Sequence, residues 1–170
     1  IFVPNRGSSD ITVIDSRTDE IVRRIGVGSV PHQVVVSTEL DKLAVTNSAD
    51  DTISIIDLNT FSVVSTINLD QEPEHIAMNP SGDLIAVGNI AAGTISLVSL
   101  EIEKEIHRVS GLYEPHNMTF NSDGDHLFVG NLGANIVSVI NVSSGKVIDE
   151  ISVGEHKMIA SSHSNENEYQ

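Results

Sequence analysis

The sequence contains no cysteine and no tryptophan, and aromatic residues make up only 4% of its 170 residues. Without cysteine, the chain cannot form disulfides, thiolate metal sites or cysteine nucleophiles. The apolar residues, 39% of the total, are therefore largely Val, Ile and Leu, a mixture rich in β-branched side chains that pack well on pleated sheets. This composition is typical of a folded protein and not of a disordered one.

Basic residues and long apolar runs are also scarce. Nine Lys and Arg stand against 24 Asp and Glu, which gives a formal net charge of −15. Binding to a nucleic-acid backbone needs clustered Lys and Arg, and an anionic membrane surface would repel so acidic a chain. No apolar run approaches the ~20 residues that a membrane-spanning helix needs. We therefore expect no nucleic-acid partner and no insertion into a membrane.

What the sequence does contain is a repeat of 42 residues. The runs IFVPN, LAVTN, IAVGN and LFVGN place an Asn at the same point of each unit, and a second and a third strand-like run keep the same spacing. A fourth run begins with proline in three of the four units. The equivalent Asn residues are Asn5, Asn47, Asn89 and Asn131, the proline-led runs span 31–37, 73–79 and 115–121, and the units start near residues 1, 43, 85 and 127.

Each unit thus holds four short runs with strand character, separated by turn sequences such as NPSGD and NSDGD. No stretch shows a sustained period of 3.6 residues, so we expect no helix. Four strands in a repeat of this length are typical of the blades of a β-propeller. We therefore predict an all-β propeller of four four-stranded blades over residues 1–163, followed by a polar tail at 164–170.

The order of the runs bears on how a ring would close. If the proline-led run is the innermost strand A, the chain starts with strands B, C and D and ends with an extra strand A at 157–163. That strand could pair with the first three, complete a closed ring of four blades and protect two open sheet edges. Two alternatives stay open: the chain is part of a larger ring, or two copies form a homodimer that completes one.

The repeat resembles a known family. LAVTN with ISIID at 43–57, and PHNMTFNSDGDHLFVGN at 115–131, are similar to the YVTN-type β-propeller repeats of surface-layer and periplasmic proteins, and the pattern covers nearly the whole chain. The resemblance implies a location in the periplasm or at the cell surface. The start at Ile1, inside a strand-like run and without Met, favours a mature, trimmed or partial sequence, and removal of a signal peptide is one way in which such a start could arise. The wider group includes the haem-carrying propellers of dihaem nitrite reductases, amine dehydrogenase propellers and lactonase-type propellers.

Histidines stand at the start of the proline-led runs. His32 and His116 occupy the same place, and in the second unit Glu74 fills it and His75 follows. In the last unit the strict spacing gives Met158, with His156 two residues earlier. Because strand A lines the central channel of a propeller, these side chains could converge near the ring axis.

Two interpretations of these histidines compete. Imidazole is a ligand for zinc, copper, iron and nickel, and it also ligates haem, as Met158 could. Alternatively, Pro-His belongs to the repeat itself and closes the connection between strands D and A by hydrogen bonding. In a ring of seven or eight blades, the side chains would also lie too far apart to share one ion. The candidate ligands for a divalent metal or a haem are His32, His75, His116 and His156.

Other signals of catalysis or metal binding are weaker. The NSDGD segment at 121–125 resembles the start of a calcium loop, but it lacks the later ligands and is better explained as a hairpin turn. Neither a G-x-S-x-G nucleophile motif nor a Gly-rich phosphate loop occurs. We therefore assign no catalytic residue.

Three function classes follow. The first is a non-enzymatic binding or scaffold module that recognises a protein or a small ligand through the D-to-A and B-to-C loops, which gather on one face around the channel mouth. The second is a redox or cofactor-handling propeller in which the strand-A histidines contact haem or a metal. The third is a lactonase-like or lyase-like enzyme that uses a divalent cation.

Overall fold

The computed structural model describes residues 1–154, and every regular element in that range is a β-strand. Fifteen strands form four antiparallel sheets, each built from strands that follow one another in the chain. This arrangement confirms the all-β prediction and the spacing of the blades. The described residues contain no helix that could span a membrane.

The sheets are numbered here in chain order. Sheet I consists of β1 (Phe2–Asn5), β2 (Asp10–Asp15) and β3 (Glu20–Gly26), and sheet II of β4 (Pro31–Ser37), β5 (Lys42–Asn47), β6 (Thr52–Asp57) and β7 (Ser62–Asn68). Sheet III consists of β8 (Pro73–Met78), β9 (Leu84–Asn89), β10 (Thr94–Ser99) and β11 (Lys104–Val109). Sheet IV consists of β12 (Pro115–Phe120), β13 (His126–Asn131), β14 (Ile136–Asn141) and β15 (Lys146–Ser152).

The predicted strand A opens three of the four sheets. Strands β4, β8 and β12 each begin at the proline that the repeat places there, and each lies at the edge of its sheet. Sheet I has only three strands among the described residues, because the sequence begins at the strand that corresponds to strand B. The predicted closing strand at 157–163 and the polar tail at 164–170 lie outside the described residues.

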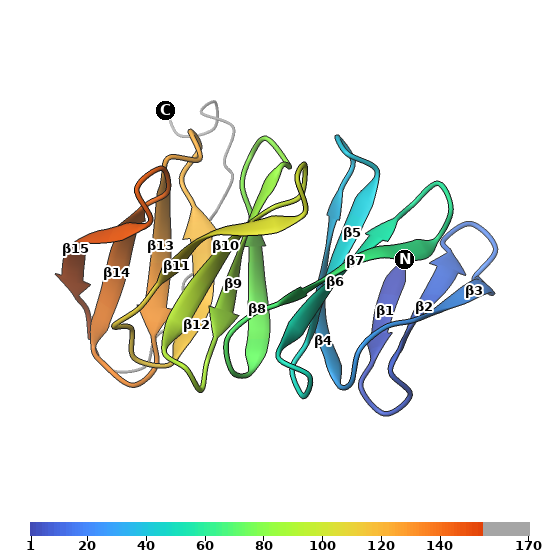
Figure 1. Cartoon of the computed structure of the whole chain (residues 1–170), viewed down its shortest axis with the longest axis horizontal. Helices are drawn as coiled ribbons and strands as arrows, with labels where there is room; N and C mark the ends of the chain where they lie inside the picture. Colours follow the sequence, from blue (N-terminus) through green and yellow to red (C-terminus); the bar gives the residue numbers. More distant parts are fainter. Residues whose placement is uncertain (155–170) are drawn as a thin grey trace, which may run out of the picture.

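The four sheets stand side by side in an open row (Figure 1). The inner strands of successive sheets contact one another: β1 contacts β4, β4 contacts β8, and β8 contacts β12. The outer strands β3 and β7 also meet. Sheets I and IV lie at opposite ends of the row (Figure 1). Within residues 1–154 the row therefore does not close into a ring.

The hydrophobic core lies between the sheets and not within any one of them. One core cluster joins sheets I and II, a second joins II and III, and a third joins III and IV. The alternation along β5 explains this: Leu43 and Val45 pack toward sheet I, whereas Ala44 packs toward sheet III. Sheets covered on both faces need apolar residues at nearly every position, which is why β5 and β9 are buried almost throughout.

The Asn that ends each strand B closes the turn to strand C. Asn47 is fully buried, and its side-chain Nδ2 donates to Thr52 Oγ1 at 3.0 Å and to Ser54 Oγ at 2.9 Å. Asn89 makes the same two bonds in sheet III, at 3.0 Å each. The repeated Asn is thus a structural residue that satisfies buried hydroxyl groups.

Candidate functional site

Each strand A starts with a β-bulge that turns its first side chains. In β4 the register jumps between Pro31 and Val34, which leaves two residues opposite one residue of β5. Strands β8 and β12 carry the same irregularity directly after their own prolines. Bulges re-aim side chains and are frequent beside functional sites. The bulge residues here include the three predicted histidines of the described range.

These three histidines lie in a row across sheets II, III and IV, which we call the histidine row: His32, His75 and His116. The ring centroids of His32 and His75 are 5.6 Å apart with the planes at 74°, and those of His75 and His116 are 3.7 Å apart with the planes at 48°. By repeat spacing, His75 is equivalent not to His32 but to Gln33. This one-residue shift, in which Glu74 precedes the histidine, places the His75 ring between the other two.

The hydrogen bonds of the row differ from one ring to the next. His32 Nδ1 lies 3.3 Å from the Glu74 carbonyl oxygen, and its Nε2 lies 3.9 Å from Glu74 Oε2. His116 Nδ1 lies 3.2 Å from Asn117 Oδ1. The Nε2 atom of His75, by contrast, is buried and has no hydrogen-bond partner among the described residues. The central ring therefore carries a buried nitrogen whose hydrogen-bonding capacity is unused among the described residues.

Its surroundings also keep His75 neutral. Burial lowers the pKa of His75 to about 4, and the neighbouring His116 and His32 add to this by charge repulsion, while the Glu74 carboxylate acts in the opposite direction. At neutral pH the ring is therefore an uncharged imidazole, the form that ligates metals or exchanges hydrogen bonds. Glu74 takes part in this site as the acidic neighbour of both His32 and His75.

The histidine row is a line of rings in edge and tilted contact and not a set of ligands around one ion. Within residues 1–154, no group of three or more His, Asp or Glu side chains is placed to hold a metal ion. The fourth predicted ligand, His156, and the alternative ligand Met158 lie outside the described residues. Metal binding by these histidines therefore stays a prediction.

A second site was not predicted from the sequence. An open pocket of about 390 Å³ lies where the loop after β3 crosses the ends of β6 and β7, and its lining includes Gly28, Asp50 and Thr66. The signal for it in the sequence is Thr66, which stands where the first and third repeats have Arg24 and Arg108.

Comparison with known proteins agrees with the observed architecture. No family model and no curated protein matches the chain. Among solved structures, it is similar to hydrazine synthase of Kuenenia stuttgartiensis, with a TM-score of 0.81 and 21% identity over 89% of this chain and 45% of that one. It is also similar to the dihydro-heme d1 dehydrogenase NirN in complex with DHE, with a TM-score of 0.75 and 15% identity over 89% of this chain and 34% of that one. Both are β-propeller proteins.

The chain has the β-propeller fold, and its residues 1–154 form an open segment of a propeller. It spans less than half the length of either solved chain. At these identities the likeness shows the fold alone, and one propeller fold hosts many unrelated activities. The finer resemblance to YVTN-type repeats remains a prediction from the sequence.

Proposed function

We propose that this propeller segment is a binding module whose histidine row contacts a haem-type ligand through a single imidazole. The observation that carries the proposal is the buried, unpartnered Nε2 of the neutral His75 ring. Leaving such an atom without a partner costs about 1–3 kcal/mol, and a ligand that bonds to it would recover that cost.

The number of available donors favours a macrocycle over a bare ion. A protein zinc site uses three or four side-chain ligands, and no such group occurs within residues 1–154. A haem iron, held in its four ring nitrogens, needs only one or two ligands from the protein. One neighbour by fold, NirN, is named for dihydro-heme d1, which supports the same ligand class for this chain.

A bound haem would itself supply any chemistry at its iron, and the residues of this chain would hold and orient the haem. His75 would offer Nε2 to the iron. His32 and His116 flank that ring at 5.6 and 3.7 Å between centroids, so they fix its orientation and limit its exposure to water. Glu74, bonded to His32 through its carbonyl, fixes the bulge that carries His75.

A titration with haemin, followed by absorbance, tests the proposal. We expect a saturable change in the Soret band with the full chain, its loss in His75→Ala, and its retention in His107→Ala, which removes a half-buried histidine on β11 that contacts the Ser143 carbonyl oxygen. An identical spectrum in His75→Ala, or no saturable change in the unaltered chain, would contradict the proposal. A Zn²⁺ titration of the same proteins, followed by NMR of the imidazole rings, separates a haem-type ligand from a simple divalent ion.

The second candidate is a module that recognises a protein or small ligand through the loop face. The pocket beside Gly28 and Asp50 favours it, because it lies among the D-to-A and B-to-C loops that the sequence analysis assigned to recognition. The lining of this pocket contains none of the three histidines, so the two sites are tested separately.

A further inference from the structure

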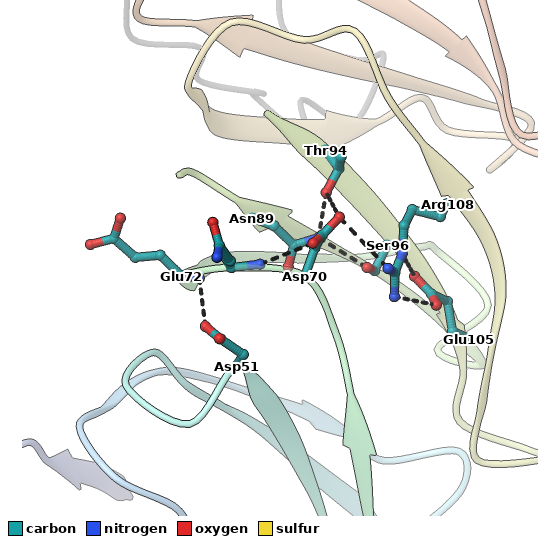
Figure 2. A network of polar contacts seen from close by, with 9 residues as sticks. Asp51, Asp70, Glu72, Asn89, Thr94, Ser96, Glu105 and Arg108 are labelled. Carbon is teal, nitrogen blue, oxygen red and sulfur yellow. Dashed lines mark hydrogen bonds and ion pairs between the residues drawn. The ribbon is translucent and has the colours of Figure 1, made fainter. Parts of the chain in front are cut away.

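The repeat makes it possible to compare one location in all four sheets: the place where the loop from the preceding sheet crosses the ends of strands C and D. In sheet III this location is filled by a network of charged side chains (Figure 2). Arg108 donates from Nε and Nη2 to the two carboxylate oxygens of Glu105, at 2.9 and 2.8 Å. Its Nη1 lies 3.6 Å from Asp70 Oδ2, which also accepts the Thr94 hydroxyl at 3.2 Å. The sheet thus supplies both an acid and a guanidinium.

Sheet I also pairs an arginine with an acid here, but the acid stands at the position of Thr94 and not of Asp70 or Glu105. Arg24 lies two repeats before Arg108, and its Nη1 is 3.6 Å from Asp10 Oδ2. Sheet IV has apolar groups at two of the three positions, since Leu112 replaces Asp70 and Val147 replaces Glu105 in the same core cluster, and Glu150 stands in place of Arg108. In three sheets, therefore, the chain occupies this location with its own side chains.

Sheet II lacks them. Repeat spacing puts Gly28 in place of Asp70, Val63 in place of Glu105 and Thr66 in place of Arg108. The result is the open pocket of about 390 Å³ that these three residues line. Its floor is unchanged: Thr52 and Ser54 accept from Asn47 just as Thr94 and Ser96 accept from Asn89.

Sheet II nevertheless has a carboxylate at this location, and it comes from the loop between β5 and β6 instead of the loop before strand A. Asp50, on the rim of the pocket, accepts the backbone N–H of Ser29 at 2.6 Å through Oδ2. In sheet III the equivalent N–H, that of Gln71, donates to Asp70 Oδ1 at 3.3 Å. The Ser29 hydrogen bond lowers the pKa of Asp50, so the carboxylate is charged at neutral pH. Among the described residues, no Lys or Arg forms an ion pair with it.

We propose that the pocket of sheet II binds a guanidinium group on an alkyl stem, in the place that Arg108 occupies in sheet III. Asp50 would pair with the planar fork of the guanidinium, which matches a carboxylate better than an ammonium does. The hydroxyl oxygen of Thr66 is a further acceptor, and Val63 gives the stem an apolar wall. The net charge of −15 attracts a cation to this surface. The site goes beyond the proposed histidine function and does not depend on it.

The test is a titration of the ¹⁵N-labelled full chain, followed by the amide signals of Gly28, Ser29 and Thr66. The probes are N-acetyl-arginine amide, which mimics a side chain in a protein, free arginine and N-acetyl-lysine amide. We expect saturable shifts with the arginine derivative and at least tenfold weaker binding of the lysine derivative. Binding of free arginine alone would identify a small-molecule ligand, and binding of both arginine probes would identify an arginine side chain of a partner.

Two variants with matched controls decide the outcome. Asp50→Asn keeps an acceptor for Ser29 but removes the charge, and Thr66→Arg restores the residue type of sheets I and III. Both should weaken binding at least tenfold, whereas Asp41→Asn and Thr38→Arg, exposed in the β4–β5 turn at the other end of the sheet, should not. Equal shifts with arginine and lysine derivatives, unchanged binding in Asp50→Asn, or no saturable shift at all would overturn the proposal.

Discussion

The neutral state of His75 makes a direct prediction about stability and pH. The pKa of this histidine is 6.5 in an unfolded chain and about 4 in the folded one. Between these values the unfolded state binds a proton that the folded state does not. The free energy of unfolding must therefore fall as the pH is lowered from 6.5 to 4, and the stabilisation is fully present only above 6.5.

The structure sets the size of this effect. The full interval between the two pKa values corresponds to about 3 kcal/mol. Because the residue is only partly buried, solvent screens the interactions of its ring, and we expect about 1–2 kcal/mol. The pKa of several carboxylates, such as Asp57 and Asp83, is lowered by hydrogen bonds, so their contribution is lost only below their ordinary value of 3.8. The window from 6.5 to 4 therefore belongs to histidine.

Urea unfolding between pH 4 and 7.5 measures the effect. As the pH falls over this range, the free energy of unfolding should decrease by about 1–2 kcal/mol more in the unaltered chain than in His75→Gln, because glutamine does not titrate. His126→Gln, which replaces a histidine that contacts Asp125 near the surface, serves as the control and should keep the slope of the unaltered chain. Titration of the imidazole signals by NMR gives the pKa directly.

Two results would refute the reasoning. One is a His75 titration midpoint near 6.5, which would mean that burial and the neighbouring rings do not act on it. The other is a parallel loss of stability in His75→Gln, which would assign the pH dependence to other groups.

Two further predictions concern packing between sheets. Gly88→Ala should destabilise the fold by about 1–3 kcal/mol, because a Cβ there would lie 3.0 Å from the Pro115 backbone carbonyl oxygen of the next sheet, besides 2.8 Å from the more flexible Met118 Cε. Gly7→Ala, with nothing within 4 Å of the added Cβ, should change thermal stability little. Lys42→Met should cost about 1–2 kcal/mol in urea unfolding, since its Nζ bonds to sheet III, including Glu103 at 2.8 Å. Adding Glu103→Gln to that variant should cost little more, and a further full loss would show that the ion pair is not the source of the effect.

Much of the fold could be predicted because each strand is specified locally. The apolar runs and the turns between them repeat every 42 residues, and strands β4, β8 and β12 begin at the predicted prolines. Whether the row of sheets closes into a ring could not be predicted from these local patterns. Closure depends on how neighbouring sheets twist and pack, which is a property of several units together and not of any one repeat.

The candidate sites were predicted unequally. The histidines drew attention because they recur beside proline, but their contact depends on a bulge in each strand and on His75 standing one residue later than His32. The pocket at Asp50 gave no signal of its own. None of its lining residues by itself indicates a binding site. The pocket becomes apparent only because Thr66 replaces the arginines, Arg24 and Arg108, that occupy the same position in two other sheets.

The sequence by itself determined that this chain has no cysteine chemistry, a strongly acidic surface and a series of antiparallel blades, because composition and alternation act within each strand. The tertiary structure alone decided which side chains meet. It brought His32, His75 and His116, which are far apart in the chain, into one row, and it left sheet II open where its neighbours are filled. The physical reason is that burial, pKa and pocket volume depend on contacts between sheets. The order of residues in the sequence does not give the distances between side chains of different sheets.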